Sequence, residues 1–566
     1  MLDQAQAGWP VLAAVCRPGN GPAAHVSLAG REQFPPADGS VVPVVQHDTG
    51  TVTFVYESDG LRLADRYERF PALGSAGWRR SLHFINDTDQ TLDLVRAQLD
   101  FQAEPATAEA VAWHRHPFHM VRTTSGQLLC VAKWNEAENV NLQGSPAGDV
   151  RAEVGAAWRL APGQSAPIQW VDVWLAPGTG DDPTRREARR WYAAHGVAKV
   201  EYPDWVYRSI WYEASAAGHI DSRFSDTGGF AAFACQIPYL TAAGVNTMWL
   251  NSVQTHKAGA NALAGWNHYG PRNQLEIDPI LGGADGFARL AAVMREQDMH
   301  LIGEIVPHGG HSVQAEALPA WHTRDRDGTL RKNWGGCGMD NASPAWQDVC
   351  RQSMRLLADT GGIEGVRIDV APGQGANWGS PRTNHASYST MGGCLELMAA
   401  LRDGIRTDAC PIPILLPESG DQPEMFGVPG AATLGYGWAF WMFSQKFKGA
   451  LLTQPEQLNQ ELRTFFENER GSLPPGALGL RTINNHDTVC HSGRPAFRFG
   501  VGLQRALYGV LLSVPGVPML YQEEEVGSFF ALRDLNLARQ ALPQLAAGEV
   551  VYPPADFVHP AVFAEV

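Results

Sequence analysis

The chain has 566 residues, 44% of them hydrophobic, and is long enough to bury the cores of two or three globular domains. Its formal net charge of −15 argues against a nucleic-acid partner or an anionic membrane surface, because an acidic protein gains no electrostatic attraction from either. A neutral ligand is compatible with this charge. The 18 tryptophans offer indole faces on which sugar rings can stack, although we expect most of them to fill cores.

The eight cysteines lie far apart and include no CxxC pair, so the sequence predicts neither a disulfide framework nor a zinc site. We expect them to be buried thiols in a reducing compartment. The first residues lack a basic stretch followed by an apolar core, and no apolar run reaches membrane-spanning length. Together these features predict a cytoplasmic protein.

Residues 1–195 are predicted to form a β-sandwich. Short segments of alternating polarity, such as Thr51–Tyr56 and Trp78–Ile85, are separated by turn clusters such as Asn86–Asp89. A helix over Pro183–His195 is predicted to link the sandwich to the next domain. We expect the sandwich to brace that domain rather than to bind sugar.

In residues 196–545, strand-like runs alternate with helical patterns, which predicts parallel strands joined by crossover helices. Strands are predicted at Ser209–Tyr212, Asn246–Leu250, Leu301–Val306, Val366–Val370, Ile414–Leu416, Leu434–Phe443, Leu478–Ile483 and Val517–Tyr521. Helices are predicted at Phe233–Ala243, Ala284–Gln297, Ser343–Thr360, Met391–Arg406, Pro455–Asn468, Phe499–Ser513 and Ala531–Ala541. This α/β pattern predicts a (β/α)8 TIM barrel with its active site at the C-terminal ends of the strands.

The fourth predicted strand carries an arginine and a carboxylate on one face. Glycines bound its short apolar run, and side chains of a strand alternate, so Arg367 and Asp369 point the same way. An adjacent arginine favours the ionised carboxylate, which is the form that a nucleophile needs. The alternative is a purely structural ion pair at a strand end.

Two further acids follow predicted strands, Glu418 after the fifth and Asp487 after the seventh. Because the C-terminal ends of barrel strands share one rim, we expect both to lie near Asp369. Hydrolysis of a glycosidic bond with retention of configuration needs an ionised nucleophile and a protonated acid about 5 Å apart. Asp369 suits the first role and Glu418 the second.

Several motifs resemble those of the α-amylase family, glycoside hydrolase family thirteen, or a close clan relative. Gly365–Ala371 is similar to the nucleophile strand of the family, Leu415–Ser419 to its acid/base strand, and Asn485–Thr488 to the segment whose His and Asp hold sugar hydroxyls. The resemblance runs from about residue 205 to 566. It implies Asp369 as nucleophile, Glu418 as acid/base and Asp487 as transition-state stabiliser, with substrate-binding roles for Arg367, His486 and the stacking residue Tyr269.

The segment after the third predicted strand departs from the family pattern. Gly309 stands where the family has a histidine, and Gly270 stands where it has an Asp after the stacking tyrosine. Either His308 or His311 would reach the same sugar hydroxyl, or the site accepts a sugar that differs from glucose near its C6 group. The remaining alternative is that both are loop histidines without a role. We see no cluster of oxygen ligands for calcium and expect no cofactor or metal.

Residues 546–566 resemble the first strand of the β domain that normally closes these enzymes, so the fold is expected to end in a truncated C-terminal β domain. A barrel without that domain would expose apolar surface, and we expect poor solubility or self-association.

The sequence thus predicts a retaining α-glycoside hydrolase that acts on α-linked gluco-oligosaccharides or related glycans through a covalent glycosyl-enzyme intermediate. Three alternatives stay open: a transglycosylase that uses the same residues, a non-catalytic carbohydrate-binding homologue, and a sandwich-plus-barrel glycosidase with galactose-type or N-acetylated substrates. The expected partner is a carbohydrate, and the oligomeric state is left open.

Overall fold

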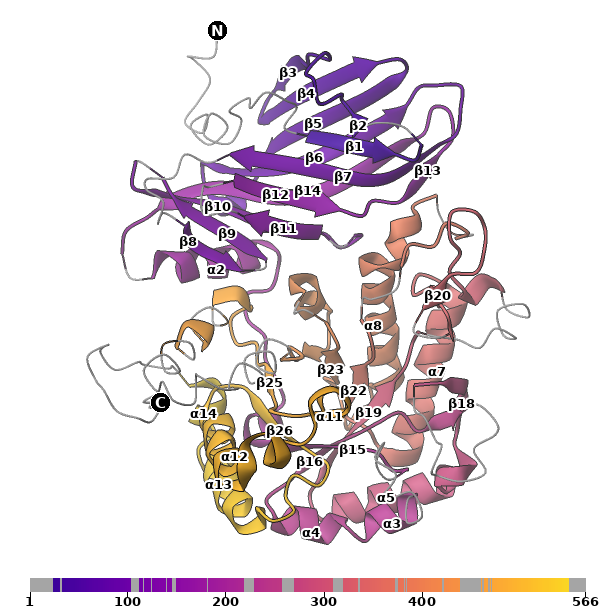
Figure 1. Ribbon diagram of the computed structural model, residues 1–566, viewed down its shortest axis with the longest axis vertical. Coiled ribbons are helices and arrows are strands. Elements are labelled where there is room, and N and C mark those ends of the chain that lie inside the picture. Colours follow the sequence, from indigo (N-terminus) through magenta and orange to yellow (C-terminus); the bar gives the residue numbers. More distant parts are fainter. Residues whose placement is uncertain are drawn as a thin grey trace.

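The computed structural model describes residues 24–548, which form three large β-sheets, one of them surrounded by helices (Figure 1). Within that range the description leaves out residues 31–32, 103–110, 116, 124, 139, 145–148, 181, 218–228, 257–268, 309–318, 334–335, 372–374, 381, 383, 420–421, 438–459, 461–462, 467–468 and 470.

Residues 24–177, here called the β region, form two antiparallel sheets. The six-stranded sheet contains β1 (Ala24–Leu28), β2 (Gln33–Phe34), β7 (Leu92–Gln102), β11 (Val140–Gly144), β12 (Asp149–Val154) and β13 (Trp158–Leu160). The eight-stranded sheet contains β3 (Val44–Asp48), β4 (Thr51–Ser58), β5 (Leu61–Arg69), β6 (Gly77–Asn86), β8 (Val111–Arg115), β9 (Phe118–Arg122), β10 (Gln127–Lys133) and β14 (Ser165–Pro177). Alternate residues of strands such as β5 are buried, and apolar side chains of both sheets meet in one core.

The third large sheet is parallel and curled, in the order β24-β23-β22-β19-β16-β15-β26-β25. Its strands are β15 (Trp211–Ala214), β16 (Thr247–Leu250), β19 (His300–Ile305), β22 (Gly365–Ile368), β23 (Ile414–Pro417), β24 (Ala432–Thr433), β25 (Leu480–Arg481) and β26 (Val517–Tyr521). Nearly every residue in them is buried, as expected for parallel strands that are covered on both faces.

The chain segments at the two edges of this sheet are hydrogen-bonded to each other. Gly435, just after β24, donates its N–H to the carbonyl of Leu478 at 3.0 Å and accepts from the N–H of Leu480 at 2.8 Å. Gly437 has a φ of +75°, and a Cβ there would lie 1.9 Å from the carbonyl oxygen of Leu480, so only glycine permits this approach. These bonds therefore connect the β24 edge of the sheet to the β25 edge.

Helices cover the outside of the parallel sheet (Figure 1). They are α3 (Phe230–Ala234), α4 (Ile237–Ala242), α5 (Gly283–Glu296), α7 (Pro344–Gly361), α8 (Met391–Ile405), α12 (Pro495–Ser513), α13 (Phe529–Ala541) and α14 (Gln544–Ala547). The short helix α11 (His486–Ser492) lies among the strands instead. Helices α5, α7 and α8 each begin and end within one residue of the predicted boundaries.

Two predicted elements differ from the structure. The single helix predicted at Phe233–Ala243 is two helices, because Pro238 lacks an N–H and is tolerated in the first turn of α4 but not inside one continuous helix. The sixth strand, predicted at Leu434–Phe443, is the two-residue β24 (Ala432–Thr433), which ends directly before the predicted range; residues 438–443 lie outside the described residues. Most of the helix predicted at Pro455–Asn468, and residues 549–566, lie outside the described residues.

The β region packs against the parallel sheet through the linking helix α2 (Pro183–Ala194). The rings of Trp191 in α2 and Phe118 in β9 meet at 5.0 Å between centroids. Both belong to an apolar cluster that also contains Trp211 and Trp249 of β15 and β16. The two parts of the molecule therefore share a core.

All six described cysteines are free, and Cys235 is exposed, so the prediction of buried thiols is wrong at this position, where α3 ends at the surface. Over the described ranges, no helix combines the length and apolar character needed to cross a bilayer.

Candidate active site

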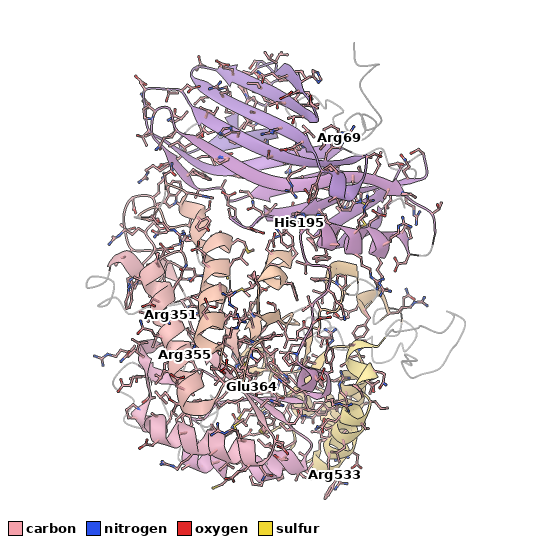
Figure 2. All side chains as sticks on the ribbon, turned by 180° about the vertical axis from the view of Figure 1, so that it is seen from behind. Arg69, His195, Arg351, Arg355, Glu364 and Arg533 are labelled. Atoms are coloured by element: carbon pink, nitrogen blue, oxygen red, sulfur yellow. The ribbon has the colours of Figure 1, made fainter. Side chains whose placement is uncertain are left out.

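The candidate active site lies at the C-terminal ends of the parallel strands, where Asp369 directly follows β22 and Glu418 directly follows β23. The backbone N–H of Asp369 bonds to β19 at 3.0 Å and that of Glu418 to β22 at 2.9 Å, so adjacent strands fix both positions. Glu364, labelled in Figure 2, precedes β22 at its other end and bonds His300 at 2.6 Å. The segment around β22 thus carries a hydrogen-bonded His–Glu contact at one end and the candidate nucleophile at the other.

Arg367 holds the two carboxyls together. Its fully buried guanidinium bonds Asp369 through Nη1 and lies 2.6 Å from Glu418 through Nη2. The same group lies 2.7 Å from Glu304 and 3.4 Å from the hydroxyl of Tyr436. One cation therefore faces three buried or mostly buried acids.

These surroundings separate the pKa values of the two carboxyls. Burial raises the pKa of Glu418 to about 7, against the attraction of Arg367 and with the help of the negative charge on Asp369. Burial also opposes ionisation of Asp369, but Arg367 and a hydrogen bond from His308 outweigh it and hold the pKa of Asp369 well below its usual range. Near pH 7, Asp369 is ionised while much of Glu418 keeps its proton.

Val370 connects the two carboxyls through the backbone. Its φ is +46°, in the left-handed region that β-branched residues rarely adopt. In this conformation its N–H donates to Oε2 of Glu418 at 2.9 Å. Residues held in such sparsely populated conformations cluster at functional sites, where the surrounding structure must maintain them.

His486 and Asp487 lie in the first turn of α11, which follows β25. Asn485 caps this helix by accepting the N–H of Thr488 at 2.9 Å, and the Thr488 hydroxyl accepts the N–H of Asn485 at 2.8 Å. This capping box fixes the chain entering the helix. The side chain of Asp487 is 36% exposed and approaches Nε2 of His486 at 3.5 Å, so it can meet a ligand from the open side.

His486 is held between Glu213 and Tyr269. Its Nδ1 bonds the buried carboxylate of Glu213, on β15, and its Nε2 bonds the Tyr269 hydroxyl. Although burial opposes the charge, Glu213 raises the pKa of His486 to about 9. His486 is therefore an imidazolium at neutral pH, with both ring nitrogens donating.

A shared amide links this cluster to the carboxyl pair. The Nδ2 of Asn251 donates to Glu304 at 2.9 Å and reaches Glu213 at 3.5 Å. The indole N–H of Trp249 also donates to Glu304 at 2.9 Å. Neighbouring strands thus form one charged network beneath the rim.

The remaining predicted site residues fall in different places. His308 is buried and bonds Asp369 through Nε2, so it belongs to the site, whereas His311 lies outside the described residues. Tyr269 contacts His486 with ring centroids 5.4 Å apart. Within the described part of the chain, no group of three or more His, Cys, Asp or Glu residues is arranged to hold a metal ion.

Sequence reasoning missed five members of the network, which lie on β15, on or after β16, on β19 and after β24: Glu213, Trp249, Asn251, Glu304 and Tyr436. The available signal was a single charged residue in an apolar strand, as in Trp211–Ala214. A buried acid is expensive unless it is paired, so such a position indicates an unseen partner.

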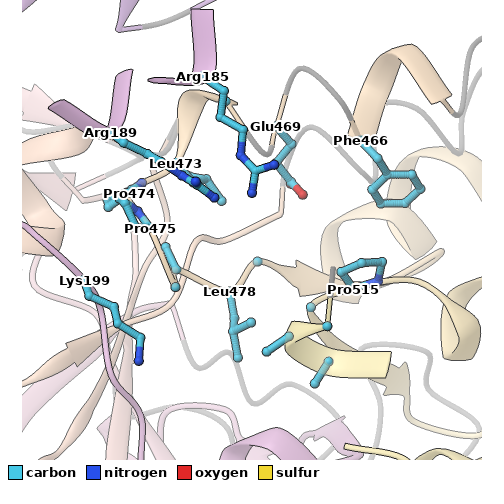
Figure 3. A pocket seen from close by; sticks show the side chains of 18 of the residues that line it. Arg185, Arg189, Lys199, Phe466, Glu469, Leu473, Pro474, Pro475, Leu478 and Pro515 are labelled. Carbon is cyan, nitrogen blue, oxygen red and sulfur yellow. The ribbon is translucent and has the colours of Figure 1, made fainter. Parts of the chain in front are cut away.

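A separate cavity of about 470 Å³ lies between α2 and the beginnings of β25 and β26 (Figure 3). Arg185, Arg189 and Lys199 reach its rim. Deeper in the cavity, Arg481 is paired with Glu469, with a contact of 2.8 Å. The cavity lies at the N-terminal ends of the strands, opposite the carboxyl pair, and is distinct from the candidate active site.

No protein-family model matches this chain, and no curated protein is similar to it. Among solved structures, the GH36 α-galactosidase AgaA from Geobacillus stearothermophilus, in complex with 1-deoxygalactonojirimycin, is 12% identical with a TM-score of 0.53. The similarity covers 95% of this chain and 78% of that one. It therefore includes the β region as well as the parallel sheet, and it shows that the two chains share a fold.

Two α-amylases resemble a smaller part of the chain. A noncanonic maltogenic α-amylase, AmyB, from Thermotoga neapolitana is 20% identical, with a TM-score of 0.47 over 61% of this chain and 80% of that one. An α-amylase from Anoxybacillus is 15% identical, with a TM-score of 0.48 over 62% and 82% of the two chains.

Proposed function

We propose that this protein is a retaining α-glycosidase, built on a (β/α)8 barrel, in which Asp369 is the nucleophile and Glu418 the acid/base. The observation that carries the proposal is that one guanidinium, that of Arg367, contacts both carboxyls while their pKa values are driven in opposite directions. An ionised and a protonated carboxyl side by side are what a two-step displacement at an anomeric carbon needs.

In the first step, an oxygen of Asp369 attacks the anomeric carbon and the bond to the leaving oxygen breaks, while Glu418 gives its proton to that oxygen. In the second step, the Glu418 carboxylate takes a proton from water, and the water oxygen displaces Asp369 from the same carbon. A sugar hydroxyl in place of water would give transglycosylation with the same residues.

The common contact with Arg367 supports retention. Both Asp369 and Glu418 contact the guanidinium of Arg367, which favours a short separation of the two carboxyls, and retaining enzymes hold their carboxyls about 5 Å apart. Inverting enzymes separate their carboxyls by roughly 6.5–9.5 Å to hold such a water.

Three further side chains would shape the sugar subsite. Asp487 would bind sugar hydroxyls and Tyr269 would offer an aromatic face. His486 would bind a sugar hydroxyl through Nε2 when the Tyr269 hydroxyl gives up that bond, while its Nδ1 stays on Glu213. A carboxylate near the anomeric centre stabilises the positive charge that develops on the sugar in the transition state.

The proposed substrates are α-linked gluco-oligosaccharides or related glycans. An α-galactoside is the second candidate, because AgaA shares the fold over 95% of this chain. Gly270 and Gly309 lack the polar side chains that the α-amylase resemblance would place there, which removes two contacts to a glucosyl unit.

The test is hydrolysis of aryl α-glucosides, α-galactosides and N-acetylated α-glycosides, together with maltooligosaccharides, with the first anomer released followed by NMR. Release of the α-anomer from one sugar supports the proposal and names the substrate. Initial release of the β-anomer contradicts retention. Sugar binding without turnover by the folded protein favours the non-catalytic homologue.

A further inference from the structure

One segment of the β region bridges the loops that follow the two carboxyl-bearing strands. This tie segment, Lys133–Glu138, begins at the last residue of β10. Lys133 and Asn135 contact the loop after β23, which begins with Glu418, and Glu138 contacts the loop between β22 and α8. A single short stretch of the β region therefore touches both active-site loops.

The contact to the Glu418 loop is a buried ion pair. The side chains of Lys133 and Glu424 are both 0% exposed, with Nζ 3.6 Å from Oε2. Lys133 also donates to Oε1 of Gln422, and the N–H of Asn135 donates to Oε1 of Glu424 at 2.8 Å. Gln422 and Glu424 lie at the start of the short 3₁₀ helix Pro423–Gly427, only a few residues after Glu418.

Glu138 makes the contact to the loop between β22 and α8, and its carboxylate accepts three hydrogen bonds. Glu138 accepts from the indole of Trp158 at 3.1 Å, from His385 at 2.7 Å and from the hydroxyl of Ser387 at 3.0 Å. The rings of Trp158 and His385 stack with centroids 3.7 Å apart. The tie segment is thus anchored on the barrel side as well as by its own strand.

The chemistry of the tie indicates a positioning role. Burying an ion pair costs desolvation that an apolar pair of similar volume would avoid, so such a pair contributes more to fixing one arrangement than to stability. The two residues that Lys133 contacts, Gln422 and Glu424, follow Glu418 by only a few residues. An error of about 1 Å in placing a proton donor can reduce the rate about 100-fold.

We infer that Lys133 is a positioning residue which, through Glu424 and Gln422, sets the place of the Glu418 carboxyl relative to Asp369. The β region is then part of the catalytic apparatus rather than a brace alone. This inference rests on the proposed role of Glu418 as proton donor, and it goes beyond that role by naming the group that holds the donor in place.

The test variant is Lys133→Met combined with Glu424→Gln, because Lys133→Met alone would leave an unpaired buried carboxylate. The amide oxygen that Glu424→Gln introduces can still accept the N–H of Asn135. The matched control is Arg80→Met with Asp65→Asn, which removes another buried ion pair, with a 2.7 Å contact, inside the β region.

The kinetic readout is the dependence of kcat/KM on the leaving group. General acid catalysis contributes about 10²–10⁴-fold, so the test variant should lose about 10–100-fold on phenyl glycosides and less than about 3-fold on dinitrophenyl glycosides, which leave without a proton. The control variant should keep the leaving-group dependence of the wild type, so that any loss is the same on both substrates. An equal loss on both substrates, or no loss, would overturn the inference.

Hydrogen exchange supplies a readout that does not depend on turnover. In the test variant, amides of residues 414–427 should exchange faster than in the wild type, while those of β26 should not change. Unchanged exchange at residues 414–427 would contradict the inference that Lys133 holds this loop in place. If the wild type cleaves no glycoside, the proposed function fails, and the exchange experiment still decides whether Lys133 holds this loop.

Discussion

The Arg367 guanidinium lies 2.6 Å from the carboxylate of Glu418 and at the same time bonds Asp369, so one side chain joins the two groups that the proposed reaction requires. Arg367→Lys should reduce kcat/KM about 100-fold or more, because an ammonium is a point charge and cannot hold two carboxyls with a planar fork. Steady-state kinetics on the best aryl glycoside measures this effect. A loss smaller than about 3-fold would contradict the bridging role.

Removing the charge of Asp369 or the proton of Glu418 should impair catalysis without impairing oligosaccharide binding. Asp369→Asn and Glu418→Gln are each expected to lower kcat by about 10³-fold or more and to leave oligosaccharide affinity, measured by calorimetry, within a few-fold of the wild type. Glu364→Gln is the matched control, because Glu364 lies at the opposite end of β22. Comparable losses in all three variants would indicate a general defect of the strand.

The pH dependence of kcat/KM follows from the two pKa shifts. Activity should fall as the pH rises through about 7, because Glu418 then loses the proton that it must donate. On the acid side, activity should persist below the usual range of an aspartate, because the pKa of Asp369 is lowered. Glu418→Gln should abolish the alkaline fall in its residual activity on activated substrates. An unchanged alkaline limb would assign it to another group.

Glu213 should control the charge of His486. The pKa of His486 is about 9, against an ordinary value of 6.5, so its pairing with Glu213 stabilises the fold fully below pH 6.5, and this stabilisation is lost as the pH rises through 9. Glu213→Gln should remove this contribution, on the order of a few kcal/mol. Denaturant unfolding of both proteins from pH 6 to 10 measures the difference, which should shrink above pH 9. A difference independent of pH would contradict the assignment.

Val370→Gly tests the strained backbone between the carboxyls. Glycine adopts a φ of +46° without the steric cost of a β-branched residue, so the variant should gain about 1 kcal/mol of stability or lose none. Val366→Gly, within β22, should instead cost roughly 2 kcal/mol or more. Thermal unfolding compares the two. A large loss at Val370 would mean that its side chain, not its backbone, is the essential part.

Much of the architecture was predictable because burial leaves a strong pattern. The runs that became β23 and β26 are apolar throughout, as parallel strands covered on both faces usually are, and in β22 only Arg367 interrupts the apolar run. The predicted boundaries of all three were close. The sixth strand was not predictable, because Ala432–Thr433 is too short to show a period. Its position depends on the contact of Gly435 with Leu480 across the sheet.

In the candidate site, too, local relations were predictable and long-range contacts were not. Alternation along one strand correctly placed Arg367 beside Asp369, since that relation is local. The pairing of Glu213 with His486 joins residues 273 positions apart, and the tie from Lys133 to Glu424 joins residues from different parts of the molecule. Relations of this kind depend on the register and packing of whole sheets, which no short sequence pattern encodes.

The most direct test of the central claim is to trap the glycosyl-enzyme. The wild type would be mixed with activated 2-deoxy-2-fluoro α-glycosides of glucose and galactose, and the labelled peptide would be identified by mass spectrometry. The account predicts one sugar per chain, on Asp369, and no label on the Asp369→Asn variant. A label on another carboxylate, such as Glu304 or Glu418, or no label from a sugar whose glycosides the protein hydrolyses, would contradict it.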